Sequence, residues 1–306
     1  MHPKITVHAP ATVANVVCGF DVLGFALAEP YDTLHISLSD TAGVRIRNLD
    51  TFELPTDPTR NCAGGALLAM LREVDEPIGF EVESAKAIKP GSGIGSSAAS
   101  AAAAVVGANR LLGDRFGRAD LVRFATFGEE IASGARHADN IAPCIYGGFT
   151  LIRSNTPLDI VPLPYPMLWV TVVHPQIEIR TADARRLLKS EIPLADAITQ
   201  WGNVGGLVAG LMLPDYDLIA RSLHDVVAEP YRRVLIPHFD AVKHASMAAG
   251  ALGGGISGSG PSIFMLSRTE HTAMAVGEAM RSVYALSGIG FHIHVTTISA
   301  NGATVQ

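Results

Sequence analysis

The sequence predicts a two-domain α+β protein. Of its 306 residues, 48% are hydrophobic and 17% are charged, a composition that supports a sizeable buried core. Strand-like and helical segments mix along the chain without a strict strand–helix alternation, which is typical of α+β layers. Prolines at positions 157, 162, 164 and 166 mark the expected boundary between domains. We therefore expect one domain over residues 1–160 and a second over residues 161–306.

In the first predicted domain, strands precede and follow a group of helices. Alternating or clustered apolar residues predict strands at Ile5–Ala9, Leu34–Ser39, Gly43–Arg47, Phe80–Ser84 and Ala85–Ile88, and around Gly148–Arg153. Apolar residues at helical spacing predict helices at Asn61–Val74, 97–112 and Leu121–Ser133. We expect Asp120 to cap the last of these helices and Gly134 to end it. Residues 10–19 are expected to form a polar connection.

The second predicted domain has fewer strands and more helices. Strands are expected at Leu168–His174, Ser262–Leu266 and His292–Thr297. Helices are expected at Ala182–Ser190, Pro193–Met212, Tyr216–Val227, Ile236–Ala249 and His271–Ala285. Between them, Gly253–Gly260 is expected to form a glycine-rich loop.

Charge and cysteine content exclude several classes of protein. The net charge is −6 and no run of Lys or Arg occurs, which argues against a nucleic-acid partner. Residues 98–106 are apolar, but the run is too short to span a membrane, and the first residues lack an apolar signal segment. The three cysteines, Cys18, Cys62 and Cys144, are isolated from one another. We therefore expect a cytoplasmic protein with no membrane partner.

A glycine–serine loop runs from Pro90 into the helix predicted at 97–112. Gly91, Gly93 and Gly95 allow tight turns and close approach of a ligand, and Ser96 and Ser97 add hydroxyl groups. Because the first N–H groups of a helix lack intrahelical partners and the helix dipole is positive there, this segment predicts a phosphate site. It is neither a Walker A loop nor a dinucleotide fingerprint. The alternative is a glycine-rich loop that only packs.

Polar residues in four other segments are candidates for chemistry. Asn15 and Asp21 flank a turn at Gly19, and Glu129, His137, Asp139 and Asn140 surround the end of a predicted helix. Arg185 and Arg232 lie near helix ends, where an arginine fork can bind a carboxylate or phosphate. Residues 253–262 form a second glycine–serine segment that could pack against a ligand or against the first loop. Turn capping, surface salt bridges and solvated helix ends remain structural alternatives for these groups.

Three of these segments resemble the motifs of the GHMP small-molecule kinases. They are Pro-Ala-Thr-Val-Ala-Asn at 10–15, Gly-Ser-Gly-Ile-Gly-Ser-Ser-Ala-Ala at 91–99 and Ile-Ser-Gly-Ser-Gly-Pro-Ser at 256–262. Within that superfamily the chain most resembles the homoserine kinases, through residues 20–24, 137–143 and 229–232. The order and spacing of the motifs match over nearly the whole chain. One departure is Val17-Cys18, where the family usually has Gly-Pro.

The resemblance implies a fold and an activity. The fold would be the two-domain GHMP kinase fold, with an N-terminal domain like the second domain of ribosomal protein S5 and a ferredoxin-like C-terminal domain. The activity would be ATP-dependent phosphorylation of the side-chain hydroxyl of L-homoserine to O-phospho-L-homoserine, a step of threonine biosynthesis. Mg²⁺ would be the cofactor and the protein would be a homodimer.

The resemblance also implies roles for individual residues. Ser97 and Glu129 would hold Mg²⁺ and, with Asn140, form the catalytic group. The following residues would bind ATP: Asn61, Lys86, Lys89, Pro90, Gly91, Ser92, Gly93, Ile94, Gly95, Ser96 and Ser97. The following would surround homoserine: Asn15, Asp21, His137, Asp139, Arg185 and Arg232. Asn140 stands where some GHMP kinases place an aspartate base, and asparagine cannot take a proton.

Two other functions are consistent with the same motifs. The first is a GHMP kinase for another small alcohol, such as a shikimate- or mevalonate-type substrate, against which the paired arginines and the His-Ala-Asp-Asn segment argue. The second is a catalytically silent ligand sensor, which would be expected to lack Ser97 or Glu129, and both are present.

Overall fold

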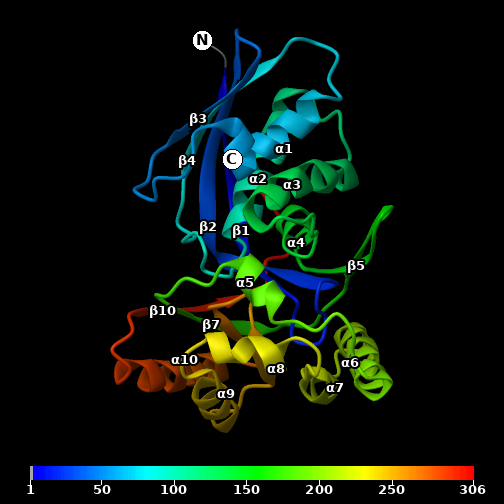
Figure 1. Ribbon diagram of the computed structural model, residues 1–306, viewed down its shortest axis with the longest axis vertical. Helices are drawn as coiled ribbons and strands as arrows, with labels where there is room; N and C mark the ends of the chain where they lie inside the picture. The colour runs from blue at the N-terminus through cyan, green and yellow to red at the C-terminus, as the bar shows by residue number, and fades with distance from the viewer. Residues whose placement is uncertain (1–2) are drawn as a thin grey trace.

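The computed structural model describes residues 3–306, in which two sheets each pack against their own helices (Figure 1). The first sheet has the strand order β11-β1-β2-β4-β3, and β5 extends it by pairing with β2 and β6. Its strands are β1 (Lys4–Ala14), β2 (Leu23–Ser39), β3 (Gly43–Asn48), β4 (Gly79–Ala85), β5 (Phe149–Asn155), β6 (Leu158–Leu163) and β11 (Thr304–Val305). Neighbouring strands are antiparallel except β3 and β4, which run parallel.

Four α-helices pack with the first sheet. They are α1 (Cys62–Leu71), α2 (Ser96–Leu111), α3 (Arg118–Ser133) and α4 (Ile141–Tyr146), and a short 3₁₀ turn at Pro58–Arg60 precedes α1. The alanine-rich α2 lies between the sheet and the helices α1 and α3. A Cβ atom at Gly107 of α2 would lie 2.5 Å from Cγ2 of Ile36 on β2. Small residues therefore let this helix approach the sheet closely, which fixes where its N-terminus lies.

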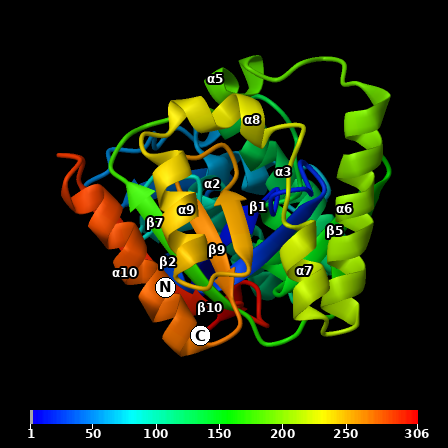
Figure 2. The same cartoon turned by 90° about the horizontal axis from the view of Figure 1, so that it is seen from below.

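The second sheet has the order β10-β7-β9-β8 and is antiparallel. Its strands are β7 (Trp169–Pro175), β8 (Gly253–Ile256), β9 (Ile263–Ser267) and β10 (Phe291–Thr297). The helices that follow β7 are α5 (Thr181–Arg186), α6 (Leu194–Met212), α7 (Tyr216–Ser222), α8 (Glu229–Arg232), the 3₁₀ turn Arg233–Leu235, α9 (Phe239–Ala248) and α10 (Glu270–Ala285). Figure 2 shows α9 and α10 across this sheet and the α6–α7 pair to one side. None of the helices in residues 3–306 combines the length and apolarity that a membrane span requires.

Several predicted boundaries were wrong, and hydrogen bonds explain two of them. Residues 10–14 continue β1 because they pair with β2 beyond a bulge, instead of forming a connection. The strand predicted to reach Ile88 ends at Ala85, because the N–H groups of Ala87 and Ile88 donate to the carboxylate of Asp32. In the second half, residues 253–256 pair with β9 as strand β8, so only the remainder of that glycine segment is a turn.

Three predicted helix boundaries also differ. The helix expected over Tyr216–Val227 ends at Ser222, and the helix expected from Ile236 begins at Phe239. The third predicted helix begins at Arg118 with Gly117 as its N-cap, so Asp120 lies in the first turn instead of capping it.

The proline-rich stretch at the predicted domain boundary contains β6, which pairs only with β5 among the described strands. Proline is tolerated on such an edge, so the predicted boundary at residue 160 falls within a strand of the first sheet.

Candidate active site

A cavity of about 490 Å³ lies where the two halves meet, beside the N-terminus of α2. Sixteen of the residues predicted for the site line it: Asn15, Asp21, Asn61, Lys86, Pro90, Gly91, Gly93, Gly95, Ser96, Ser97, Glu129, His137, Asp139, Asn140, Arg185 and Arg232. Lys89, Ser92 and Ile94 are not among its lining residues. Most of the residues predicted from separate motifs therefore share one cavity.

The first glycine loop has the backbone conformation that its sequence predicts. Gly91, Gly93 and Gly95 have φ values of 73°, 82° and 74°, a region that residues with side chains rarely adopt. Gly95 is the N-cap of α2 and, as a glycine, has no side chain with which to cap the helix. The orphan N–H groups of the first turn of α2 therefore begin at the cavity, where an anion would complete their hydrogen bonding.

The second glycine segment packs directly against the first. The Ser257 hydroxyl donates to the carbonyl oxygen of Gly93 at 2.7 Å, and the Ser262 hydroxyl donates to that of Ser92 at 2.6 Å. A Cβ atom at Gly93 would lie 2.5 Å from the carbonyl oxygen of Gly260. Of the two roles that the sequence left open for this segment, packing against the first loop is present.

Ser97 and Glu129 meet at the cavity although they lie on different helices. The Ser97 hydroxyl donates to Oε2 of Glu129 at 2.8 Å. Burial raises the pKa of the Glu129 carboxyl above its usual value, while the hydrogen bonds from Ser97 and Ser133 oppose that shift. Within residues 3–306, no ion pair with Glu129 is formed. A buried carboxylate beside a hydroxyl, without a cationic partner, is a suitable pair of oxygen ligands for a divalent cation.

Lys86 reaches the cavity wall but its ammonium group is fully occupied by the protein. Its side chain is 1% exposed and forms an ion pair with Asp32, which is 4% exposed. The same Nζ donates to the carbonyl oxygen of Ser96 at 3.0 Å and to the Ser100 hydroxyl at 2.8 Å. An ammonium group has three N–H donors. Lys86 therefore holds the start of α2 against the segment before the glycine loop.

The other predicted ATP-binding side chains also have structural partners. Asn61 caps α1, with Oδ1 accepting from the N–H groups of Ala63 and Gly64. Lys89 donates from Nζ to Oε1 of Gln176 at 2.8 Å. The Ser96 hydroxyl donates to the carbonyl oxygen of Ile88 at 2.9 Å. Of the groups predicted to bind ATP, the loop backbone and the Ser97 hydroxyl, which can still accept a hydrogen bond while donating to Glu129, therefore have polar capacity left toward the cavity.

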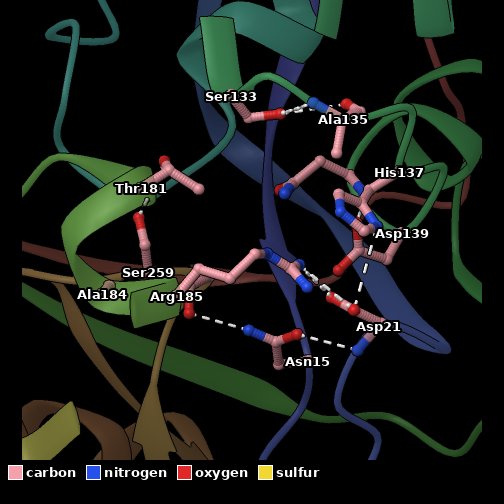
Figure 3. Close-up of polar contacts among 12 residues, drawn as sticks. Asn15, Asp21, Ser133, Ala135, His137, Asp139, Thr181, Ala184, Arg185 and Ser259 are labelled. Atoms are coloured by element: carbon pink, nitrogen blue, oxygen red, sulfur yellow. Dashed lines mark hydrogen bonds and ion pairs between the residues drawn. The ribbon is translucent and has the colours of Figure 1, made fainter. Parts of the chain in front are cut away.

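In the same cavity, a cluster of charges gathers around Asp21 (Figure 3). Nη2 of Arg185 donates to both carboxylate oxygens of Asp21, at 3.0 and 3.1 Å. Nδ1 of His137 lies 3.8 Å from Oδ2 of the same carboxylate. Burial lowers the pKa of His137 below its ordinary value, and its buried Nε2 has no hydrogen-bond partner among the described residues. A polar ligand could provide that partner.

Arg232 is the second arginine of the cluster and is 3% exposed. Its Nη1 donates to the carbonyl oxygen of Gly258 at 3.2 Å, and its Nε donates to that of Ala184 at 3.3 Å. Its guanidinium carbon lies 4.8 Å from the ring centroid of Phe20, and that of Arg185 lies 5.5 Å from the same ring. Burial, and then Arg185, lower the pKa of Arg232. An anionic ligand would offset that repulsion.

Asp139 and Asn140 also line the cavity. Burial, reinforced by the carboxylates of Asp21 and Glu129, raises the pKa of Asp139 to about 7. Oδ1 of Asn140 accepts from the Thr12 hydroxyl at 2.8 Å. A Cβ atom at Gly95 would collide with the same hydroxyl, so Thr12, Asn140 and the start of α2 pack together.

Four residues that shape the site were not predicted. Asp32 binds Lys86, Phe20 lies under both arginines, Thr12 binds Asn140, and the Gly258 carbonyl binds Arg232. Thr12, Phe20 and Gly258 fall inside motifs that the sequence displays, so their place in a motif was the available signal. Asp32 lies outside all of the motifs and carries no such signal.

Comparison with known proteins gives a consistent result over the whole chain. Residues 61–148 match the model of the GHMP kinases N-terminal domain, and residues 207–286 match that of the GHMP kinases C-terminal domain. The homoserine kinase of Chloroherpeton thalassium is 46% identical over 99% of each chain, and that of Chlorobium phaeobacteroides is 47% identical over 97% of this chain and 98% of that one. The crystal structure of homoserine kinase from Cytophaga hutchinsonii has a TM-score of 0.95 and 50% identity, covering 100% of this chain and 98% of that one.

Proposed function

The chain belongs to the homoserine kinase family of the GHMP kinases, and on that premise we propose that it transfers the γ-phosphoryl group of ATP to the side-chain hydroxyl of L-homoserine. The product would be O-phospho-L-homoserine, an intermediate of threonine biosynthesis. One observation carries the proposal. A single cavity joins the free N-terminus of α2 to a cluster formed by the buried carboxyl group of Asp139, the partly exposed carboxyl group of Asp21 and two arginines.

The triphosphate would bind along the first glycine loop. The orphan N–H groups at the start of α2 and the helix dipole favour the phosphate oxygens. Asn61 and Lys86 line the same end of the cavity, where they position α1 and α2, respectively. We propose that both act by holding these helices, and that the Ser97 hydroxyl and the loop backbone contact the phosphates.

The amino acid would bind on the other side of the cavity. The carboxylate would be held by the arginine fork of Arg232, whose repulsion with Arg185 an anion relieves. The ammonium group would lie near Asp139, and Asn15, Asp21 and His137 would complete the polar surroundings. In this orientation the side-chain hydroxyl of homoserine would point toward the glycine loop, where the γ-phosphoryl group of ATP would lie.

Mg²⁺ is the divalent cation that suits this site. It prefers oxygen ligands and is commonly held by one or two protein groups together with substrate phosphates. In the described part of the chain no group of three or more His, Cys, Asp or Glu side chains is arranged to hold a metal by itself. Ser97 and Glu129 would hold the cation jointly with ATP, and it would neutralise charge on the transferring phosphoryl group.

Proton removal does not require Asn140 to act as a base. Its amide cannot accept a proton, and its oxygen is already hydrogen-bonded by Thr12. Phosphoryl transfer depends mostly on positioning and on stabilisation of charge. We propose that the bond from the homoserine oxygen to γ-phosphorus forms as the bond to the ADP oxygen breaks, and that the hydroxyl proton leaves late, to the phosphoryl group itself.

The test is an ADP-release assay with homoserine, shikimate, mevalonate and galactose as separate acceptors, with phosphorylated product identified by mass spectrometry. We expect turnover to be highest with L-homoserine. Faster turnover with one of the other alcohols would assign the enzyme to a different substrate class. ATP consumption that is independent of every acceptor would contradict kinase function at this site.

We also propose that the protein is a cytoplasmic homodimer. Free cysteines at positions 18, 62 and 144 are consistent with a reducing compartment. An apolar stripe on α6 supports self-association, since Leu194, Ile198, Trp201 and Met212 are 52–69% exposed along one helix. Light scattering should give a mass of two chains, and Trp201→Glu should reduce it to one. A monomeric wild type would contradict the dimer.

A further inference from the structure

The segment that carries Asn15 and Asp21 has an unusual backbone. Asn15, Val16, Val17 and Asp21 have φ values of 70°, 41°, 61° and 60°. A β-branched residue with positive φ is a genuine outlier, and such strain persists only where the surroundings hold the backbone in place. The two valines are buried, with exposures of 0% and 4%. The contacts that hold residues 15–21 therefore bear directly on the site.

On the cavity side, the segment is held through Asn15. Its Nδ2 donates to the carbonyl oxygen of Gly258 at 2.7 Å, and its Oδ1 accepts from the N–H of Asp21 at 3.0 Å. The Gly258 carbonyl also accepts from Arg232. The two sides of the predicted homoserine site thus meet at one carbonyl group.

On the outer side, the same segment is held by Gln200 of α6. Nε2 of Gln200 donates to the carbonyl oxygen of Cys18 and to Oδ1 of Asp225, both at 2.8 Å. Its Oε1 accepts from the N–H of Val226 at 3.0 Å. The side-chain amide of Gln200 therefore joins three segments that are distant in sequence: α6, the strained segment at Cys18, and residues 225–226.

Asp225 extends this connection to Arg232. The Asp225 carboxylate is 5% exposed and accepts from the backbone N–H groups of Val227, Ala228 and Glu229. Glu229 is the first residue of α8, the four-residue helix that ends at Arg232, and Val227 and Ala228 directly precede it. The amide of Gln200 and the carboxylate of Asp225 together fix the strained segment and the arginine-bearing helix relative to each other.

From these contacts we infer that Gln200 and Asp225 are positioning residues for the amino-acid substrate. Neither side chain is among the residues that line the cavity. They act through the carbonyl group of Cys18 and the start of α8, which set the separation of Asn15 and Asp21 from Arg232, and the Asp225 carboxylate also attracts the Arg232 guanidinium electrostatically. The inference rests on the proposed function, because it concerns the affinity of that same site for homoserine.

The perturbation is Gln200→Met, which keeps the length of the side chain and removes all three hydrogen bonds. Loss of the Cys18 and Asp225 contacts should raise KM for homoserine about tenfold, the effect expected for one to two hydrogen bonds. KM for ATP should stay within about twofold, because the glycine loop is held by Ser257 and Ser262, to which neither Gln200 nor Asp225 is hydrogen-bonded. Asp225→Asn should also raise KM for homoserine.

Asn203→Ala is the matched control. Asn203 lies on the same helix and donates to the carbonyl oxygen of His224, next to Asp225, but among the described residues its side chain forms no hydrogen bond with residues 15–21 or with α8. We expect it to lower the thermal unfolding temperature, though by less than Gln200→Met because only one hydrogen bond is lost, and to leave KM for homoserine unchanged.

The outcomes separate this inference from the proposed function. If wild-type enzyme fails to phosphorylate homoserine, the proposed function is wrong. If wild type is active and Gln200→Met leaves KM for homoserine unchanged, or raises KM for ATP equally, or matches Asn203→Ala, the positioning role is wrong. If Gln200→Met does not fold, Asp225→Asn is compared with Asn203→Ala in the same way, since the asparagine oxygen can still accept from some of the backbone N–H groups of residues 227–229. If neither variant folds, the contacts are required for folding in general and the inference is overturned.

Discussion

Breaking the buried ion pair between Lys86 and Asp32 should destabilise the protein and weaken ATP binding together. The pair is 1% and 4% exposed, and Asp32 also accepts from the N–H groups of Ala87 and Ile88. Removing one partner of a buried pair leaves an uncompensated charge, which costs about 3–5 kcal/mol. We expect Lys86→Met to lower the free energy of unfolding by that amount, since the Asp32 carboxylate stays buried.

The double variant gives the sharper measurement. In Lys86→Met with Asp32→Asn, no buried charge remains and the asparagine oxygen can still accept from the Ala87 and Ile88 N–H groups. Its loss of stability should therefore fall short of the sum of the two single losses by about 1–3 kcal/mol. Urea unfolding measures all three variants, and KM for ATP should rise in the two variants that lack Lys86, because the hydrogen bonds from its Nζ to Ser96 and Ser100 on α2 are lost.

The exposed pair of Arg153 and Asp159 is the control. Its side chains are 64% and 37% exposed, so Asp159→Asn should cost less than about 1 kcal/mol. Additive single and double effects at Lys86 and Asp32, or a loss as small as the control's, would refute the view that this pair holds the start of α2 against the segment before the glycine loop.

Three further predictions concern the cavity itself. Ser97→Ala and Glu129→Gln should each lower kcat strongly without unfolding the protein, because the proposed Mg²⁺ site uses both the Ser97 hydroxyl and the Glu129 carboxylate. Near-normal kcat in both variants would contradict the proposed metal role. Arg232→Leu should raise KM for homoserine about 10- to 150-fold, which corresponds to about 1.5–3 kcal/mol, and should change KM for ATP little. A rise in KM for ATP without a rise in KM for homoserine would place Arg232 at the nucleotide. Burial and the nearby carboxylates of Asp21 and Glu129 raise the pKa of Asp139 to about 7, so protonation as pH falls through 7 should weaken its attraction for the ammonium group. KM for homoserine should therefore rise below about pH 7 in the wild type and become flat in Asp139→Asn; parallel pH profiles would contradict this role.

Local chemistry explains why some features could be predicted from the sequence. The positive φ values of Gly91, Gly93 and Gly95 follow from glycine itself, and the helix after them follows from its alanine-rich composition. The predicted two-domain α+β architecture and its family are confirmed by the comparisons. These features depend on residues that are close in sequence or belong to a motif.

Non-local contacts explain what the sequence did not reveal. Lys86 was predicted to bind phosphate, but its ammonium group is occupied by Asp32, 54 positions earlier, and by two groups on α2. No periodicity marks an aspartate within a strand as the partner of a distant lysine. Likewise, Asp32 ends the predicted strand before Ile88 by accepting two backbone N–H groups. Side-chain hydrogen bonds to the backbone can override the alternation that suggests a strand.

The two glycine segments also account for how a kinase can work without a side-chain base at Asn140. The hydroxyls of Ser257 and Ser262 hold carbonyl groups of the first loop from positions 164 and 170 residues away. On the same second segment, Gly258 holds Asn15 and Arg232. The proposed phosphate site and the proposed amino-acid site are thus linked by hydrogen bonds to one segment, which would fix the positions of the phosphoryl donor and acceptor relative to each other. Such alignment can supply several kcal/mol of barrier lowering, and this is the contribution that a reaction limited by positioning requires.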